Sequence, residues 1–309
     1  MELITPPFLK KGDTIAIVAP ARKVARNDVE PAIKLFEKWG FKVLLGENIY
    51  KSYNQFAGTD TERASDFQSM LENPNVKAII CARGGYGTIR ILEHINLRAL
   101  QRDPKWIVGY SDVTVLHSIL NSWFMVETLH GIMPYNFTKN AEDNEATSSL
   151  KLVLLGESPA YTAAPHSHNK TGNASGLFVG GNLSILYSLS GTDADINTEG
   201  KILFIEDLDE YLYHIDRMMM NLKRSGKLRN IAGLVVGGMT DMNDNSTPFG
   251  KEAIDIIKEA VDEYDYPVCF NFPAGHVEQN LTLIMGRSAE LTVNEGGVSL
   301  VFTPAACKI

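Results

Sequence analysis

The stretch "KWIVGYSDVTVLHSIL", from Lys105 to Leu120, passes from an apolar strand pattern directly into a helical pattern. Residues 105–110 are predicted as a strand and residues 111–123 as a helix, with Ser111 at the junction. A parallel α/β sheet exposes side chains at such junctions and aims the N–H groups of the helix at them. Serine followed by aspartate is also a common helix start. Ser111 is therefore either a helix cap or an exposed nucleophile.

The same alternation of strand and helix extends through the first half of the chain. Its strands are predicted at residues 13–21, 41–46, 76–85 and 105–110, and its helices at 28–40, 61–73, 87–96 and 111–123. Alternation of this kind indicates βα units around a parallel sheet. We therefore expect an α/β fold whose first half is a doubly wound parallel sheet.

The second half is richer in strands, because seven strand patterns follow from Gly176 onward. The last two flank "NEGG", which is typical of a hairpin turn. Between the halves the sequence is polar and irregular, with one short helical pattern. We predict a first domain at residues 1–150, a linker at 151–175, and a smaller β-rich domain at 176–309.

Composition and charge narrow the functional classes. A chain of 309 residues with 44% hydrophobic content can bury large cores, and its net charge of −8 argues against a nucleic-acid partner. The N-terminus lacks the pattern of a signal peptide, and no apolar run approaches about 18 residues. We expect a soluble cytoplasmic protein that does not bind membranes. Cys81, Cys269 and Cys307 lack the spacing of a metal site and are expected to be reduced thiols.

A glycine-rich loop, "ARGGYGT" at residues 82–88, lies one βα unit before Ser111. In open α/β sheets, ligands bind beyond the carboxyl ends of the strands, so this loop and Ser111 should face one crevice. The loop could supply one oxyanion donor, with the backbone N–H of Asp112 as the other. A tight turn or a phosphate loop is the alternative, although the G-x-G-x-x-G spacing is missing.

Two more residues could complete a catalytic set. Glu206 ends the strand pattern of "ILFIED", and His276 lies in the loop "NFPAGHVEQN" after another strand. A nucleophilic serine needs a base, and a histidine base needs a carboxylate that fixes its tautomer. Sequence spacing says nothing about distance in space, so this set remains a hypothesis at this point.

Several long motifs in order resemble the LD-carboxypeptidase family of serine peptidases, family S66, which includes the microcin self-immunity hydrolases. The resemblance runs nearly from end to end. The motifs are "GDTIAIVAPA", "ARGGYGTIRIL", "GYSDVTVL", "LHGIMP", "GLFVGGNLSIL", "ILFIEDLDEYLYHIDRMMMNL", "GLVVGG" and "GHVEQNLTLIMG".

The resemblance implies a flavodoxin-like first domain, a smaller β-rich second domain, an active site between them, and a homodimer. It implies Ser111 as nucleophile, Glu206 as carboxylate and His276 as base, with N–H groups of Asp112 and Gly85 as the oxyanion hole. It implies no cofactor and no metal. The implied reaction releases the terminal D-alanine from the L-centre of diaminopimelate in murein tetrapeptides, during recycling of cell-wall peptides.

A carboxypeptidase must also bind the free carboxylate of its substrate. Arg83, beside Gly84, is our candidate because a guanidinium can donate two hydrogen bonds to a carboxylate. An arginine paired elsewhere in the fold is the alternative. "RGGYG" also resembles the LD-carboxypeptidases more than the microcin hydrolases, whose loop typically lacks this arginine. Asn182 either lines the pocket or caps a helix.

Other residues keep two interpretations. His130 in "LHGIMP" recurs in the family pattern and could serve only packing, while residues 218–220, "MMM", are expected in a helix core or a subunit contact. His166 and His168 could share a metal but have no third ligand nearby in the sequence.

Two competing functions also remain: a microcin-type hydrolase of aminoacyl nucleotides, and a binding module whose glycine loops only hold a peptide or nucleotide.

Overall fold

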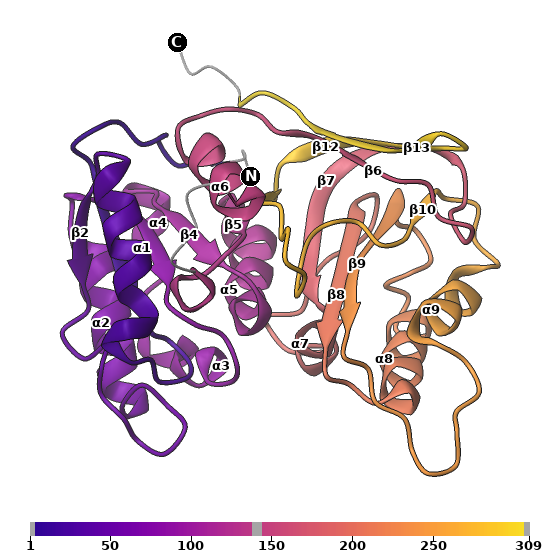
Figure 1. Cartoon of the computed structure of the whole chain (residues 1–309), viewed down its shortest axis with the longest axis horizontal. Coiled ribbons are helices and arrows are strands. Elements are labelled where there is room, and N and C mark those ends of the chain that lie inside the picture. The colour runs from indigo at the N-terminus through magenta and orange to yellow at the C-terminus, as the bar shows by residue number, and fades with distance from the viewer. Residues whose placement is uncertain (1–3, 138–143, 306–309) are drawn as a thin grey trace.

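The computed structural model describes residues 4–137 and 144–305, and its elements are arranged around two sheets that lie side by side (Figure 1). The first sheet comprises β1 (Thr14–Val18), β2 (Lys42–Leu45), β3 (Val76–Cys81), β4 (Trp106–Gly109), β5 (Thr128–His130) and β11 (Leu283–Met285). Its order is β11-β5-β4-β3-β1-β2, and all neighbours are parallel except β11 and β5. The order β2-β1-β3-β4-β5 is that of flavodoxin-like sheets, which confirms the predicted class.

Helices cover both faces of this sheet. They are α1 (Arg26–Lys38), α2 (Asp60–Glu72), α3 (Thr88–Ile91), α4 (Ala99–Arg102), α5 (Thr114–Ile119) and α6 (Glu145–Leu154). Along β1, Ile15 and Ile17 join one buried cluster with α1 and α6, while Ala16 and Val18 join another with α2 and α5. A strand buried on both faces needs a continuous apolar run, and "IAIV" supplies it. This is the doubly wound arrangement expected from the sequence.

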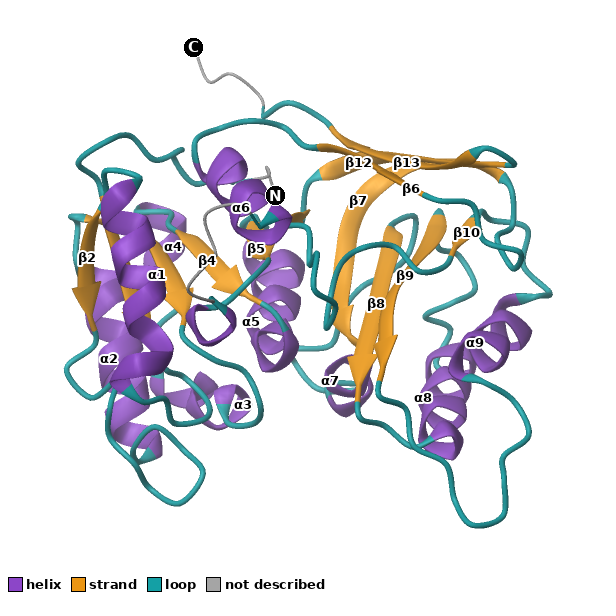
Figure 2. Ribbon diagram, in the orientation of Figure 1, coloured by secondary structure: helices purple, strands orange, loops and turns teal. Residues whose placement is uncertain are grey.

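The second sheet is mixed. It comprises β6 (Ala160–Ala163), β7 (Gly172–Asn182), β8 (Ile202–Leu208), β9 (Gly233–Thr240), β10 (Val268–Cys269), β12 (Ser288–Asn294) and β13 (Gly297–Phe302) in the order β10-β9-β8-β7-β12-β13-β6. The strands β7 to β10 are parallel, and β12, β13 and β6 add antiparallel. Three helices complete this half: α7 (Leu183–Ser188), α8 (Leu212–Arg224) and α9 (Ala253–Val261). Figure 2 shows α8 and α9 on the side of β8 and β9 that is turned away from the first sheet.

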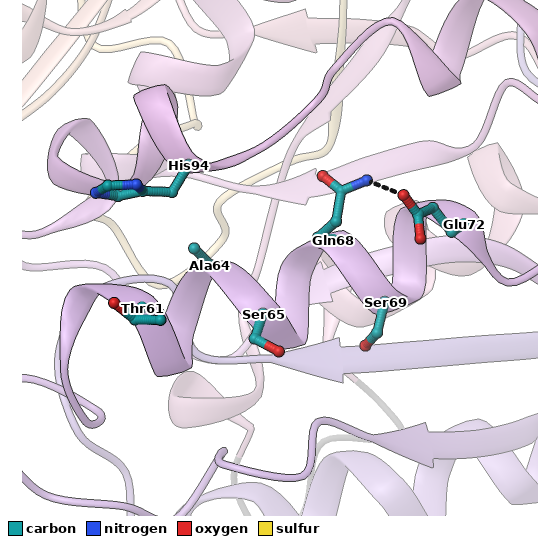
Figure 3. Close-up of a pocket in the computed structure, with 7 residues that line it drawn as sticks. All are labelled: Thr61, Ala64, Ser65, Gln68, Ser69, Glu72 and His94. Atoms are coloured by element: carbon teal, nitrogen blue, oxygen red, sulfur yellow. Dashed lines mark hydrogen bonds between the residues drawn. The ribbon is translucent and has the colours of Figure 1, made fainter.

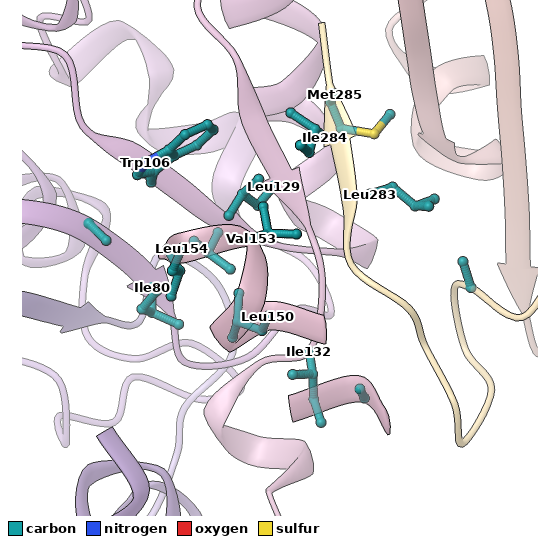
Figure 4. Close-up of a cluster of buried hydrophobic side chains, with 14 of the residues drawn as sticks. Ile80, Trp106, Leu129, Ile132, Leu150, Val153, Leu154, Leu283, Ile284 and Met285 are labelled. Carbon is teal, nitrogen blue, oxygen red and sulfur yellow. The ribbon is translucent and has the colours of Figure 1, made fainter. Parts of the chain in front are cut away.

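One hydrophobic cluster joins the two halves. Phe178 and Phe204, from β7 and β8, belong to the same buried cluster as residues of β5 and α6. Figure 4 shows the part of that cluster where α6 and β11 pack on the first sheet. Its side chains come from β3, β4, β5, α6 and β11: Ile80, Trp106, Leu129, Leu150, Val153, Leu154, Leu283, Ile284 and Met285. A continuous apolar core of this kind holds the two sheets in a fixed relation.

The structure departs from the sequence expectations in four places. Residues 151–175, expected as a linker after one short helix, also contain all of β6 and the start of β7, which pair with β13 and β12 in the second sheet. Residues 283–285, expected in the second domain, form β11 at the edge of the first sheet. The three-residue strand β5 was not predicted. The helix predicted at 87–96 is α3 followed by a short 3₁₀ turn.

Two further expectations concern membrane spans and cysteines. Among the described helices, none has the length and apolar character needed to span a membrane. Cys81 and Cys269 are buried free thiols, and burial raises the pKa of each. Cys307 lies outside the described residues.

Candidate active site

The Ser111 turn, which we define as residues 109–114, connects β4 to α5. Ser111 has a φ of 62°, in the left-handed region that a residue with a side chain seldom adopts. A Cβ at Gly109 would lie 2.8 Å from the side chain of Val113, so glycine is required at 109 for the chain to turn this tightly. The turn is therefore a strained elbow, although Val113 replaces the second glycine of the G-x-S-x-G pattern.

The glycine loop after β3 lies directly against the Ser111 turn. A Cβ at Gly84 would lie 2.9 Å from the Cβ of Ser111 and 3.4 Å from the backbone N of Asp112, so only glycine permits this approach. Within the described residues, no acceptor is found for the backbone N–H of Gly85 or Asp112. The N–H of Asp112 directly follows Ser111, and the N–H of Gly85 follows Gly84, which packs against Ser111. Free N–H groups of this kind are what an oxyanion needs.

The carboxylate of Asp112 ties the two loops together. It is buried, and one of its oxygens accepts a hydrogen bond of 2.8 Å from the backbone N–H of Thr88, at the start of α3. Burial raises the pKa of this carboxyl, and the contacts with Thr88 oppose that rise. The side chain of Asp112 thus fixes the glycine loop, while its backbone N–H stays free.

Glu206 and His276 form a hydrogen-bonded pair. The imidazole Nδ1–H of His276 donates to Oε2 of Glu206 over 2.6 Å, and the backbone N–H of His276 donates to the same oxygen over 3.1 Å. The Glu206 side chain is 0% exposed and that of His276 is 14% exposed. With Nδ1 carrying the proton, the Nε2 lone pair of neutral His276 is available as a base.

Each partner shifts the pKa of the other. Burial lowers the pKa of His276, but the charge and hydrogen bond of Glu206 outweigh burial and raise it above 6.5. Burial likewise raises the pKa of Glu206, but the charge of His276 and the proximity of His130 outweigh it and lower the pKa to about 2. Glu206 is therefore ionised at neutral pH and supports a strong base at His276.

Contacts within the loop and with distant residues fix the His276 loop, which we define as residues 273–280. A Cβ at Gly275 would lie 2.7 Å from Oε2 of Glu206, so glycine lets the loop approach the carboxylate. The side chain of Asn280 accepts a hydrogen bond of 2.9 Å from the N–H of Gly275. The hydroxyl of Thr240 donates to the carbonyl of His276 over 2.7 Å. Sequence reasoning missed the roles of Asn280, at the end of the loop, and of Thr240, which holds the loop from β9, because no sequence pattern marks such contacts.

Two contacts bring the Ser111 turn to the Glu206–His276 pair. The ring of Tyr110 packs on the ring of His276, with centroids 4.8 Å apart. On the other side of Ser111, the hydroxyl of Thr114 accepts a hydrogen bond of 2.9 Å from the N–H of Asn182, which is paired with Glu206 across β7 and β8. The three candidate catalytic residues thus come from neighbouring elements of the two halves.

Comparison with known proteins places this arrangement in a family. The model of the LD-carboxypeptidase N-terminal domain matches residues 15–131, and that of the LD-carboxypeptidase C-terminal domain matches residues 175–291. The chain is 34% identical over 94% of its length to the probable murein peptide carboxypeptidase of Bacillus subtilis, 92% of which is covered. The chain belongs to the LD-carboxypeptidase family S66. It is therefore a hydrolase, and the predicted family and enzyme class are confirmed.

Solved structures agree with this membership in the LD-carboxypeptidase family. A muramoyltetrapeptide carboxypeptidase from Oxalobacter formigenes is 28% identical, with a TM-score of 0.84 over 94% of this chain and 98% of that chain. The microcin C7 self-immunity protein MccF, solved with glutamyl sulfamoyl guanosine, has a TM-score of 0.86 at 22% identity over 98% of this chain and 99% of its own. The second likeness concerns the fold alone.

The residues predicted to bind substrate occupy different environments in this enzyme. Asn182 is buried: its amide donates to Asp207 over 2.8 Å and its oxygen accepts from the N–H of Ile185. It thus caps α7, which was one of its two predicted roles. The guanidinium of Arg83 lies 3.8 Å from the ring centre of Tyr135 and has no carboxylate partner among the described residues.

Arg22 is a further basic residue beside the glycine loop. Its side chain occupies the space next to Gly85, where a Cβ would lie 2.4 Å from its Cδ. It is exposed, and no carboxylate in the described part of the chain pairs with it. The sequence carried no signal for Arg22, since it follows β1 and only the flavodoxin-like order places that loop beside β3.

The remaining candidate residues lie away from Ser111, Glu206 and His276. Met218 and Met219 are buried in the core under α8, whereas Met220 is 40% exposed. His166 and His168 pack against Phe270, and His168 bonds to Asp255 over 3.0 Å. The described residues include no group of three or more histidine, cysteine, aspartate or glutamate side chains placed to hold a metal ion.

One surface pocket of the enzyme lies along α2 (Figure 3). It is lined by Thr61, Ala64, Ser65, Gln68, Ser69, Glu72 and His94. Within it, the side-chain amide of Gln68 donates a hydrogen bond of 2.6 Å to Glu72. None of the candidate catalytic residues lines this pocket.

Proposed function

We propose that this enzyme is an LD-carboxypeptidase of murein tetrapeptides that works through a Ser111-His276-Glu206 acyl-enzyme mechanism. The observation that carries the proposal is the buried Glu206–His276 hydrogen bond of 2.6 Å next to the Ser111 turn, with the ring of Tyr110 packed on His276. A serine on a strained elbow, a histidine of fixed tautomer and an ionised carboxylate are the three parts that a serine hydrolase needs.

The proposed steps use only side chains, backbone N–H groups and water. Oγ of Ser111 attacks the carbonyl carbon while Nε2 of His276 takes its proton. The N–H groups of Gly85 and Asp112 then stabilise the oxyanion, each contributing about 10²- to 10³-fold to the rate. His276 protonates the leaving amine of D-alanine, and a water molecule activated by His276 releases the tripeptide from Ser111.

The names of the relatives support the substrate class. The Bacillus subtilis relative is named a probable murein peptide carboxypeptidase, and that of Pseudomonas aeruginosa a murein tetrapeptide carboxypeptidase. We propose that Arg83, with Arg22 beside it, binds the terminal carboxylate, because both guanidinium groups lie at the glycine loop without a carboxylate partner among the described residues. Gly84 would allow the substrate backbone to approach Ser111.

The decisive test is incubation with L-Ala-γ-D-Glu-meso-diaminopimelate-D-Ala and measurement of released D-alanine. The same peptide ending in L-alanine is the control for stereochemistry. Release of D-alanine by the wild-type enzyme and none by Ser111→Ala would support the proposal. Cleavage of an aminoacyl sulfamoyl nucleotide without release of D-alanine would favour the microcin-type reaction. Absence of both activities, with no labelling of Ser111 by an acylating probe, would favour a binding module.

The carboxylate assignment has its own test. Arg83→Gln and Arg22→Gln should each raise KM for the tetrapeptide by about tenfold, because a charge-assisted hydrogen bond contributes about 1.5–3 kcal/mol. With the tetrapeptide amide, which lacks the terminal charge, the same substitutions should change KM much less. Equal losses with the acid and the amide would contradict the assignment.

We further propose that the enzyme acts in the cytoplasm in the recycling of cell-wall peptides, as a homodimer. The first part of the chain, residues 1–150, would supply the nucleophile, and residues 176–309 would supply Glu206 and His276. Sedimentation equilibrium of the purified enzyme would test the dimer. Cell fractionation followed by an assay for D-alanine release would test the location.

A further inference from the structure

His130, the last residue of β5, lies in the core directly behind the proposed catalytic pair. Its side chain is 0% exposed, and its ring lies near three other rings. The centroid separations are 5.0 Å to Phe204, 5.7 Å to Tyr110 and 6.2 Å to His117. Neither ring nitrogen has a hydrogen-bond partner within residues 4–137 and 144–305. A phenylalanine would fill this space without burying two unpaired nitrogens, so packing alone does not account for a histidine here.

The second unpaired atom belongs to Glu206. Its Oε2 accepts both hydrogen bonds from His276, whereas its buried Oε1 has no hydrogen-bond partner in the described part of the chain. Nε2 of His130 lies 4.0 Å from this Oε1. A movement of about 1 Å would bring the two atoms to an ordinary hydrogen-bond distance of about 2.9 Å. The two unpaired groups are therefore complementary.

The neighbouring histidine shows that this core can satisfy an imidazole. Nε2–H of His117 donates to the carbonyl of Gly109 over 2.9 Å, and its Nδ1 accepts from the hydroxyl of Thr128 over 2.8 Å. Burial, and then the proximity of His130, lower the pKa of His117 to about 3, so His117 stays neutral. It has no proton to offer to His130 or Glu206. His117 thus leaves both nitrogens of His130 unpaired, and Nε2 of His130 lies 4.0 Å from Oε1 of Glu206.

We propose that His130 is a positioning residue: its Nε2–H donates to Oε1 of Glu206 and holds the carboxylate so that Oε2 stays on His276. The kinetic consequences rest on the proposed function, whereas the effect on the titration of His276 does not. A donor on Oε1 withdraws negative charge from the carboxylate, so it limits how strongly Glu206 raises the pKa of His276. Loss of His130 should therefore raise the pKa of His276 further.

Three other titratable groups lie near Glu206 and His276 and come from different elements. They are Tyr110 after β4, His117 on α5, and Asp207 beside Glu206 on β8. Burial, then the charge of Glu206, raise the pKa of Asp207 to about 7, and burial raises that of Tyr110. All three side chains stay unchanged in the variants below, apart from His117 in the control. A change in the pKa of His276 on replacing His130 can therefore be assigned to His130 and not to these neighbours.

The experiment compares His130→Phe, which keeps a ring, with His130→Gln, which keeps an N–H donor. For His130→Phe we expect kcat to fall by about 10- to 100-fold with KM and the thermal unfolding temperature little changed. The acid limb of the kcat/KM profile should move to higher pH. His130→Gln should recover part of the lost kcat. The control His117→Gln removes a buried imidazole with satisfied nitrogens, so it should lower the unfolding temperature and leave the acid limb in place.

Titration of the His276 imidazole by NMR provides a readout that needs no substrate. Its pKa should be higher in His130→Phe than in the wild type, even if the enzyme releases no D-alanine. Failure of the proposed function would appear as an inactive wild type with this NMR shift present. Wild-type kcat and an unchanged His276 titration in His130→Phe would overturn the positioning role. So would a loss of activity that merely follows a loss of folded protein, with the titration unchanged.

Discussion

The Ser111 turn and the His276 loop lie next to each other but are fixed by different means. The turn follows from a buried strand, Gly109 and a helix start, all within a few residues of Ser111. The His276 loop is fixed by Glu206, Thr240 and Asn280, of which two lie far away in the sequence. The first is a local structure under backbone strain, and the second is a loop held by hydrogen bonds. The two regions should therefore fail in different ways when they are altered.

The largest effect is expected from removing the nucleophile in the Ser111 turn. Ser111→Ala should reduce kcat for D-alanine release by about 10⁴- to 10⁶-fold, because removal of a triad member leaves only the oxyanion hole and substrate binding. The fold should persist, because alanine fits the space of serine. The measurement is single-turnover kinetics together with circular dichroism. Retention of wild-type activity would remove Ser111 from the mechanism.

Next comes the carboxylate that supports the His276 loop. Glu206→Gln should reduce kcat by about 10⁴-fold, since the amide no longer fixes the productive tautomer of His276. Glu206 raises the pKa of His276, so its removal leaves burial to lower that pKa, and the acid limb of kcat/KM should move to lower pH. A pH–rate profile of the residual activity measures both effects.

A second glutamate–histidine pair of equal length provides the control. Glu210 and His214, at the start of α8, are also 2.6 Å apart, but their side chains remain about one quarter exposed. Glu210→Gln should leave kcat within about twofold of the wild type, because this partly solvated pair at the start of α8 has no contact with Ser111, Glu206 or His276 among the described residues. Comparable losses in Glu206→Gln and Glu210→Gln would show that the buried pair has no special role.

A smaller effect, specific to the His276 loop, is expected from adding one methyl group at Gly275. Gly275→Ala places a Cβ 2.7 Å from Oε2 of Glu206 and should displace His276, with a loss of about 10²-fold in kcat. Gly226→Ala is the matched control, since Gly226 has a φ of 81°, similar to the 96° of Gly275, but nothing within 4 Å of the added Cβ. Both variants should lose stability from backbone strain. If their kcat values are equal, close approach to Glu206 is not what the glycine provides.

The contrast between the two regions also explains what the sequence could predict. The doubly wound sheet and the position of Ser111 at a strand-to-helix junction are visible locally, because apolar runs and glycines report on neighbouring residues. The pairing of Glu206 with His276 joins residues 70 positions apart, so residue types alone left it a hypothesis and the family resemblance strengthened it. No local sequence pattern predicts the roles of Thr240, Asn280 and Arg22. The strands β5 and β11 are likewise too short to show a hydrophobic period in the sequence. They form because their apolar side chains pack in the core.

The smallest expected effect measures the strain in the Ser111 turn itself. Ser111→Gly and Ser111→Ala both lack the hydroxyl, so both should be inactive, but only glycine adopts a φ of 62° without a steric penalty. The relief of about 1–2 kcal/mol is partly offset by the greater freedom of glycine in the unfolded chain. The free energy of unfolding of Ser111→Gly should therefore exceed that of Ser111→Ala by roughly 1 kcal/mol in urea denaturation. A glycine variant no more stable than the alanine variant would mean that the turn stores no strain, and that hydrogen bonds hold Ser111 as they hold His276.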